Sequence, residues 1–421
     1  MKRTAVAVSM CFCMAPSVAY ADDWSIRSTQ SETVEANNNL LMTPVPATGY
    51  GSYSTLTTNA EDLTPTSKLD LDGTANYRKY TGPAFDTPEA ETESLSYNFK
   101  GHYELTDKDS KFDREFVEAS WSQTSSAFAL LDDLGVVTQT RGFLDRATYS
   151  GGIDRSLSPL DNLSLFATLT SVSFEPSAGG VPFTDTLARG SWQHSFSSIV
   201  SASLTSETEL LNFDNATNTQ IQLYRNQVGT NLTLSPVLSF KGNIGAIYIV
   251  TEGGSNSLVT PVSVGSTSSG SVSSNSTLLT WIGDAELTYK MLKNTTLTLD
   301  AKQTVAPSIV GSLFKTDLIS ASLNHTINSS SSLSFAASAT ESTSTTTTPF
   351  VSGSVTYAYK FTRDWSALFT YRYQHRFEST GGTGTIDPIT GTPTVISTSP
   401  GSSNSIMVTV SHSYTVLPAG S

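Results

Sequence analysis

Hydrophobic and polar side chains alternate along most of this chain with a period of two residues. In residues 238–250, hydrophobic side chains such as Phe240, Ile244 and Tyr248 occupy every second position, and Lys241 lies among the polar residues between them. The same alternation recurs in 96–105, 319–328, 365–377 and 406–416. Successive side chains of a strand point to opposite faces, so each run predicts a strand with one apolar and one polar face. No extended stripe with a 3.6-residue period competes with this pattern, and we expect an all-β fold.

The length of the runs separates an ordinary soluble sheet from one that crosses a membrane. Most runs cover about 10–15 residues, whereas soluble strands average about 5–6. A tilted strand needs about 9–11 residues to cross a bilayer. Aromatic residues gather at the ends of the apolar faces, as in Tyr357, Tyr359, Phe361 and Trp365, which suits the two membrane–water interfaces. The runs therefore predict membrane-crossing strands, with ordinary core aromatics as the alternative.

Reading the pattern from end to end gives about 18 strands, with boundaries good to a few residues. The expected strands are 24–38, 51–64, 67–81, 93–106, 111–130, 141–157, 161–175, 183–196, 198–213, 219–235, 237–252, 276–291, 294–306, 314–328, 331–344, 349–363, 364–379 and 402–417. An even number of strands places both termini of the chain on the same side of the membrane, which we expect to be the periplasm.

The connections between these strands are expected to alternate in length. The short ones are Thr64–Ser67, Ser158–Asn162, Ser235–Val237, Leu292–Asn294, Ser329–Ser332 and Thr362–Trp365. The others are mostly longer and rich in Gly, Ser, Thr, Pro and Asn, at 39–50, 82–92, 131–140, 176–182, 253–275, 345–348 and 380–401. Short turns on one side and longer loops on the other are typical of outer-membrane barrels.

Closure of the sheet follows from the cost of unpaired backbone groups in lipid. Each such group costs several kcal/mol, so a sheet survives in a bilayer only as a closed barrel without edges. The apolar face then turns outward and the polar face inward, which explains a mean hydropathy of −0.13 in a membrane protein. The sequence therefore predicts an antiparallel up-and-down transmembrane β-barrel of about 18 strands, within a range of 16–18.

The first residues have the features of a secretory leader. Lys2 and Arg3 precede a short apolar run at 4–14, and the small-residue site Ala19–Ala21 follows. We expect cleavage after Ala21, so that residues 1–21 form a signal peptide and 22–421 a single barrel domain.

Both cysteines of the chain, Cys11 and Cys13, fall inside the expected leader. The mature chain would then contain no thiol and no disulfide. Attachment of a lipid to either cysteine is the alternative, but Met10 and Phe12 are poor neighbours for that type of cleavage.

The charge balance limits the classes of partner. The chain has 24 basic and 37 acidic residues, and loss of Lys2 and Arg3 with the leader leaves 22 basic residues and a net charge of −15. An acidic chain is a poor polyanion binder, so no nucleic acid is expected as a partner. Charged residues make up only 14% of the chain, against about 25% in soluble domains.

The polar positions of the strands provide the candidate site, a set of side chains expected to line the lumen. These lumen candidates are Lys100, His102, Glu104, Arg146, Arg189, Lys241, Asp284, Glu286, Asp300, Arg372, Gln374 and Arg376. Asp70 and Asp72 belong to the same polar register. Rows of opposite charge can create a transverse field that sorts solutes. The alternative, which we favour, is that they solvate the interior and pair across strands.

No catalytic, cofactor-binding or metal-binding residues are expected. The five histidines lack the spacing of metal ligands, and no cysteines accompany them. His375 and His412 fall on the apolar register near an interface, whereas His102 lies on the polar one between Lys100 and Glu104. His102 is therefore the only histidine that we retain for an alternative, an outer-membrane hydrolase.

The start of the mature chain resembles a known group of barrels. Residues Trp24–Arg27 followed by Glu32–Leu40, and then Leu69–Tyr80 with its aromatic-basic end, are similar to the opening of β-barrel porin families, including barrels found with exopolysaccharide and PEP-CTERM export systems. Here Arg27-Ser28 replaces the Pro region and Ala36-Asn37 stands where Thr-Asp is usual. The match covers about 60 residues, and it implies a channel in the outer membrane of a Gram-negative cell.

The function expected from the sequence is a passive or export-linked outer-membrane channel. A surface adhesin or scaffold with a filled lumen, whose loops 253–275 and 380–401 bind partners, is the second hypothesis. The expected partners are outer-membrane lipid and lipopolysaccharide, the barrel-assembly machinery and polysaccharide-export components. Most such chains end on an aromatic residue read by that machinery, whereas this chain continues for seven residues beyond Tyr414 to Ser421.

Overall fold

The computed structural model describes most of the chain between residues 24 and 417. The described ranges are 24–40, 42, 44–86, 92–106, 113–125, 142–175, 180–215, 218–252, 276–307, 313–343, 347–378, 385–386, 393–394 and 400–417. The expected leader at 1–21 therefore lies outside the described residues, as do the centres of the two loops that the adhesin hypothesis uses.

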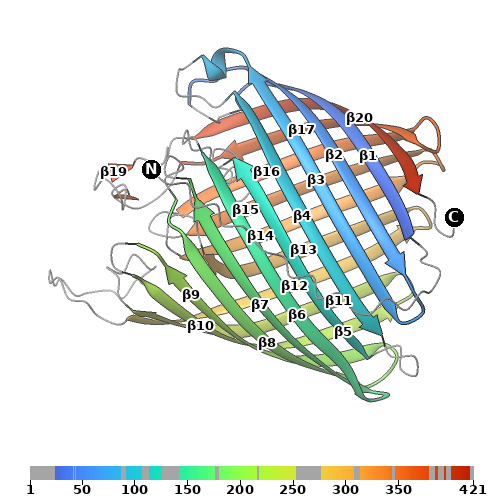
Figure 1. The fold of residues 1–421 in the computed structure, drawn as a ribbon, viewed down its shortest axis with the longest axis vertical. Coiled ribbons are helices and arrows are strands. Elements are labelled where there is room, and N and C mark those ends of the chain that lie inside the picture. Colours follow the sequence, from blue (N-terminus) through green and yellow to red (C-terminus); the bar gives the residue numbers. More distant parts are fainter. Residues whose placement is uncertain are drawn as a thin grey trace.

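Eighteen long strands form one closed ring in the order of the sequence. They are β1 (Trp24–Asn37), β2 (Gly49–Leu63), β3 (Ser67–Thr81), β4 (Glu93–Thr106), β5 (Arg114–Ser125), β6 (Phe143–Ser158), β7 (Asp161–Phe174), β8 (Phe183–Ser195), β9 (Val200–Phe213), β10 (Gln220–Ser235), β11 (Leu238–Glu252), β12 (Ser276–Leu292), β13 (Thr295–Pro307), β14 (Leu313–Thr326), β15 (Ser331–Thr343), β16 (Thr347–Lys360), β17 (Trp365–Arg376) and β20 (Gly401–Leu417). Each pairs antiparallel with its neighbours, and β1 pairs with β20 from Ile26–Leu417 to Asn37–Ser405 (Figure 1). The predicted closed, all-antiparallel barrel of 18 strands is confirmed.

The connections divide the barrel into two ends, which we call the turn end and the loop end. Tight turns such as 327–330 and 361–364 lie at the turn end, where the side chains of Asn328 and Thr362 accept hydrogen bonds from backbone N–H groups two and three residues ahead. The loop end carries a short helix, η1 (Pro83–Phe85), and a small hairpin of β18 (Thr385–Ile386) and β19 (Pro393–Thr394). One loop-end connection, 344–346, is as short as the turns, which differs from the general expectation of longer loops there.

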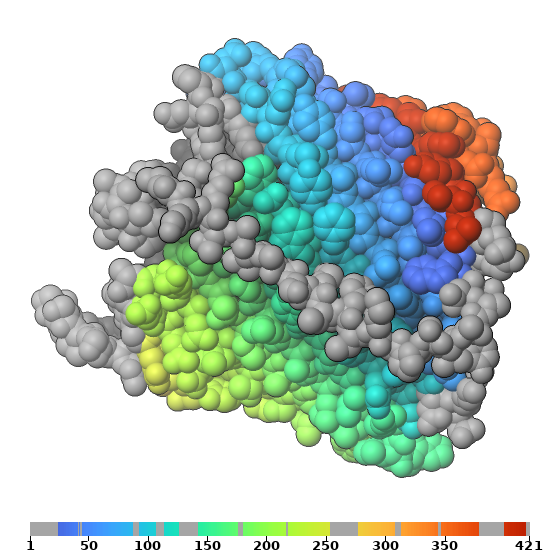
Figure 2. Space-filling view, viewed as in Figure 1, coloured from blue at the N-terminus to red at the C-terminus, as the bar shows by residue number. Residues whose placement is uncertain are grey.

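Hydrophobic side chains are exposed on one face of the wall. Leu204, Val228 and Ile244 are direct register partners on β9, β10 and β11, and their exposed fractions are 52%, 59% and 67%. In the space-filling view, side chains of neighbouring strands pack into a wall on the side shown (Figure 2). No helix among the described residues is both long and apolar enough to span a bilayer.

The opposite face is the concave one. Arg225 on β10 donates a hydrogen bond of 3.0 Å from Nη2 to the carbonyl oxygen of Val305 on β13, across two intervening strands. Such a contact is short only across the inside of a curved sheet. Arg225 lies three residues before the exposed Val228 on β10, so the two side chains point to opposite faces of the wall. The face without the exposed hydrophobic side chains is therefore the inner face.

Aromatic side chains gather on the outer face at the turn end. Trp365 and His412 stack with a centroid distance of 4.4 Å, and Tyr414 stacks on His412 at 5.6 Å. On the other side of the barrel Trp192, His194 and Phe196 form a similar series. These rings lie where a girdle at a membrane–water interface would.

A hydrophobic cluster on the inner face narrows the loop end. Its members come from β6 to β14 and from the residue Val181: Leu144, Val172, Val181, Phe183, Leu211, Phe213, Ile221, Leu223, Ile247, Ile249, Ile282, Val305 and Leu313. Pairing of β12 with β13 stops at Gly283–Gln303, whereas β13 stays paired with β14 up to Pro307–Leu313. The described loop-end part of this hairpin thus separates from β12, and Val305 and Leu313 pack against side chains of the inner face.

A second segment, the described residues between β1 and β2 (38–40, 42 and 44–48), is buried in part. Within it Leu40 is 5% exposed and Met42 is fully buried. Arg376 on β17, itself 2% exposed, donates from Nη2 to the carbonyl oxygen of Met42 at 2.9 Å. The expected loop 39–50 is therefore in part an inner packing element.

Candidate functional site

All twelve lumen candidates lie on strand positions of the inner face. On β4, for example, Phe99 and Tyr103 are exposed outside, and Lys100, His102 and Glu104 alternate with them. The same holds for the rest of the set: Arg146 on β6, Arg189 on β8, Lys241 on β11, Asp284 and Glu286 on β12, Asp300 on β13, and Arg372, Gln374 and Arg376 on β17.

Three of the candidates join one ionic network on β4, β5 and β6. Lys100 lies 2.7 Å from Glu118, and His102 lies 3.4 Å from the same carboxylate and 3.5 Å from Glu104. Glu104 in turn lies 3.4 Å from Arg114. Arg114 also makes a 2.7 Å ion pair with Asp154 on β6. His102 therefore lies between the carboxylates of Glu104 and Glu118, and its ring forms ion pairs with them only when it is protonated.

Two phenylalanine rings lie beside this network. Phe116 on β5 and Phe166 on β7 stack across β6, with a centroid distance of 6.1 Å and an interplanar angle of 27°. The residue between them in register is Gly152, and a Cβ atom there would lie 2.8 Å from ring carbons of Phe116 and from the carbonyl oxygen of Leu165. The absence of a side chain at Gly152 therefore allows the two rings to meet.

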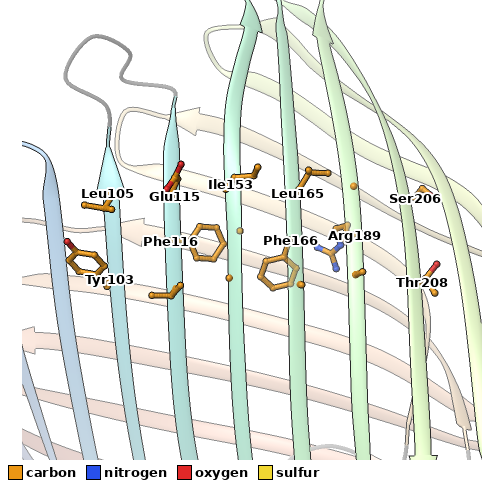
Figure 3. A pocket seen from close by; sticks show the side chains of 16 residues that line it. Tyr103, Leu105, Glu115, Phe116, Ile153, Leu165, Phe166, Arg189, Ser206 and Thr208 are labelled. Carbon is orange, nitrogen blue, oxygen red and sulfur yellow. The ribbon is translucent and has the colours of Figure 1, made fainter. Parts of the chain in front are cut away.

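Guanidinium groups flank the ring pair on both sides. Arg114 lies 5.3 Å from the centroid of Phe116, and Arg189 lies 5.7 Å from that of Phe166. Such contacts are cation–π interactions, worth about 0.5–1 kcal/mol where they are exposed. Figure 3 shows Phe116 and Phe166 on either side of β6, with Arg189 next to them on β8.

The aromatic pair continues into a buried ionic group. Arg189 Nε donates to Glu207 at 2.7 Å, and Arg225 pairs with both Glu207 and Glu209. Glu207 is 9% and Glu209 3% exposed. Asp185 belongs to the same inner face of β8. Removing carboxylates from water is costly, and Arg225 offsets that cost here.

We call the series Phe116, Gly152, Phe166, Arg189, Glu207 and Arg225 the inner row. Each member is the direct register partner of the next across β5, β6, β7, β8, β9 and β10. Phe116 lies two residues from the turn-end start of β5, whereas Arg225 lies five residues from the loop-end start of β10. Because the strands of a barrel tilt by about 35–45° to its axis, the row winds along the axis from one end toward the other.

The candidates on β17 belong to another part of the wall. Arg372 lies 3.3 Å from Glu35 on β1, which also accepts a hydrogen bond from the hydroxyl of Tyr53 on β2. Arg376 holds Met42 as described above, and Gln374 is the register partner of Ser403. Arg376 thus holds Met42 against the inner wall, and Arg372 links β17 to β1.

The remaining charged candidates on β11, β12 and β13 differ from these groups in their lack of close ion pairs in the part of the chain that the structure describes. Lys241, Glu286 and Asp300 are successive register partners, and Asp284 accepts hydrogen bonds of 3.0 Å from Asn243. Within the described residues, none of these charged groups has an ion-pair partner within 4.0 Å, and the same is true of Arg146. The expected pairing across strands is thus found at Lys100, Glu104 and Arg189, but not here.

A cavity of about 940 Å³ adjoins the wall around the ring pair (Figure 3). Both faces contribute to its lining, with Phe116, Phe166 and Arg189 from the inner face and Ile153 and Leu165 from the outer one. Glycines and small residues of β6, β8 and β9 complete it, namely Gly151, Gly152, Ala188, Gly190, Ser206 and Thr208.

Several members of the site were missed in the sequence. Arg114, Glu118, Glu207, Glu209 and Arg225 are as charged as the chosen candidates and occupy the same inner positions. Continuing the alternation through each strand would have found them. Phe116 and Phe166 gave no such signal, because hydrophobic residues were assigned to the outer face. The described residues contain no group of three or more His, Cys, Asp or Glu side chains arranged to hold a metal ion.

The ring of antiparallel strands, the exposed hydrophobic face and the charged inner face define the class as a transmembrane-type up-and-down β-barrel. No family model and no curated protein matches the chain. Solved structures similar to it include Acinetobacter baumannii OccAB2 (8% identity, 94% of this chain and 98% of that chain, TM-score 0.47), the FrpB iron transporter from Neisseria meningitidis (6%, 93% and 82%, 0.47) and the ferric-catecholate import receptor Fiu from E. coli K12 (10%, 92% and 81%, 0.45).

Proposed function

We propose that this protein is an outer-membrane channel through which small hydrophilic solutes cross. The observation that carries the proposal is the separation of the two faces around a closed ring of 18 strands. Barrels of 16–18 strands enclose an aqueous lumen when their inner side chains are polar. A soluble barrel would place its hydrophobic side chains inside instead.

The outer face supports a location in a lipid bilayer. Side chains such as Trp281, Leu279 and Ile319 are each 67% exposed, and contiguous apolar surface of this kind is rare on soluble monomers. Backbone groups of the strands are satisfied by their neighbours, which is what hydrocarbon requires. The expected signal peptide at 1–21 and cleavage after Ala21 belong to this proposal, as do lipopolysaccharide and the barrel-assembly machinery as partners.

The inner face supports transport. Lys241, Asp284, Glu286 and Asp300 carry charges that no described ion pair neutralises, so they are available to water and ions. Fixed charges of both signs on a pore wall select among solutes by charge. In the general form of the proposal, solutes cross the channel by passive diffusion. In its more specific form, the channel takes part in polysaccharide export.

A planar-bilayer recording of the refolded mature chain tests the channel. The proposal expects stepwise insertion events with an ohmic conductance, and size-graded neutral solutes should reduce it up to a sharp size limit. Protein that folds and inserts but gives no conductance would contradict the proposal.

A second function, a scaffold with a filled lumen, is favoured by a specific observation. The hydrophobic cluster on the inner face and the buried residues Leu40 and Met42 both narrow the loop end. Deleting residues 255–273 and 381–399, the central parts of the two long loops, tests it. Loss of surface binding by cells that still display the barrel would support the scaffold, and unchanged binding would reject it.

A further inference from the structure

The inner row presents two neighbouring aromatic rings between charged side chains. Phe116 and Phe166 are both half-buried, and their ring centroids lie 6.1 Å apart because Gly152 places no side chain between them. The two rings thus present one apolar strip about two rings long. On a face dominated by Ser, Thr and charged residues, this strip is not needed to pack a core.

The charges beside the rings are already balanced. Arg114 has Asp154 and Glu104 as partners, and Arg189 has Glu207. Both arginine side chains nevertheless remain partly exposed, at 43% and 46%. The site therefore offers hydrogen-bond donors and acceptors on both sides of an apolar strip, with three carboxylates around two guanidinium groups.

This combination selects among ligand chemistries. A simple anion would be attracted by the arginines but opposed by the carboxylates 2.7 Å from them. An acyclic polyol would use the donors and acceptors but leave the rings uncovered. A sugar ring has apolar C–H faces edged by hydroxyl groups, and polarised C–H groups are attracted to the negative face of an aromatic ring.

We propose that Phe116 and Phe166, together with Arg114 and Arg189, form a binding track for the pyranose rings of a neutral carbohydrate. The rings take the C–H faces, the guanidinium groups donate to hydroxyl oxygens, and Asp154, which is partly exposed, accepts from a hydroxyl group. The inference rests on the proposed channel function and names the solute class that the inner wall recognises.

The winding of the inner row gives the track a direction. The row leads from near the turn end at Phe116 toward the loop end at Arg225. A chain of linked sugar rings can therefore move along the wall from one contact to the next, with the aromatic pair as its first contact from the turn end.

The test records the full refolded protein in planar bilayers with maltohexaose as the probe. We expect concentration-dependent block of the current by maltohexaose, and little block by mannitol or benzoate at equal concentrations. The double variant Phe116→Leu/Phe166→Leu keeps apolar side chains but lacks aromatic faces, and it should raise the half-blocking concentration of maltohexaose about tenfold relative to the parent. The control Phe99→Leu removes a ring that stacks on Trp121 at 6.0 Å on the outer face, and should have no effect.

Equal block of the parent and the double variant would overturn the carbohydrate track, and so would stronger block by benzoate than by maltohexaose. A conducting channel without sugar block rejects this inference and leaves the proposed function intact. Where no conductance is found, titration calorimetry of the detergent-solubilised protein with maltohexaose decides the matter. Heat of binding that the double variant loses supports the track alone, and its absence from the parent rejects it.

Discussion

The pair of substitutions Val228→Arg and Gln227→Arg tests which face of the wall meets lipid. Val228 lies eight residues from the start of β10 and seven from its end, between the exposed partners Leu204 and Ile244. Gln227 is its immediate neighbour on the inner face. The same charged side chain is therefore introduced at the same height of the strand, once outside and once inside.

The expected difference follows from the cost of a charge in hydrocarbon. An arginine at the midplane of the lipid face of a barrel costs about 2–4 kcal/mol, whereas a substitution on a solvated surface costs less than about 0.5 kcal/mol. Val228→Arg should therefore lower the ratio of folded to unfolded protein by about 30- to 900-fold. Gln227→Arg should leave that ratio nearly unchanged, because its side chain extends into water.

Urea titration of the refolded protein in phospholipid vesicles measures the effect. The five tryptophans of the chain report folding by their fluorescence. The free energy of unfolding is compared between the two variants at the same lipid ratio. A free energy for Val228→Arg within about 0.5 kcal/mol of the parent value, or a larger loss for Gln227→Arg, would refute the orientation argued here.

Three further predictions concern the inner face. Glu207→Ala removes one of the two carboxylates that pair with the largely buried Arg225, and it should destabilise the barrel by about 3–5 kcal/mol in the same urea titration. The control Glu286→Ala breaks no described ion pair and should cost less than about 0.5 kcal/mol. Equal losses of stability in the two variants would contradict the role of burial. Lys241→Glu should shift the reversal potential in a salt gradient toward cation selectivity. An unchanged reversal potential would show that Lys241 does not line the conducting path. Gly152→Val should weaken maltohexaose block because its side chain separates the two rings, and unaltered block would show that their contact does not matter.

The strands and their order could be predicted from the sequence because the information is local. Period-two alternation gives the faces, and turn residues such as Asn328 and Thr362 fix where a strand ends. Eighteen strands follow from counting such segments, and nearest-neighbour pairing follows from the short connections. Each of these steps needs only a window of about 10–20 residues.

The site could be predicted only in part, because its contacts depend on register. Lys100 and His102 were expected to face inward from alternation alone, but their shared partner Glu118 comes from the pairing of β4 with β5. The stack of Phe116 on Phe166 depends on which residue of β6 lies between them.

Two departures from a regular barrel had no signal in the alternation. The described loop-end part of the β13–β14 hairpin separates from β12 beyond Gln303 and packs inside, so Val305 and Leu313 are buried although their register is the outer one. Met42 is buried in a segment that contains Asn, Thr and Pro residues and is expected to be an exposed loop. In both cases the hydrophobic side chains are covered by residues distant in the sequence.

The most direct test of the central claim uses two adjacent alanines of β15. Ala336 lies on the inner face and Ala337 on the outer face, and both are exposed in the isolated barrel. Single variants Ala336→Cys and Ala337→Cys, made in the mature chain that lacks Cys11 and Cys13, are refolded into lipid vesicles and treated with a charged, membrane-impermeant maleimide. The account predicts rapid labelling at 336 and none at 337. Equal labelling, or labelling at 337 alone, would contradict a barrel whose polar face surrounds water and whose apolar face meets lipid.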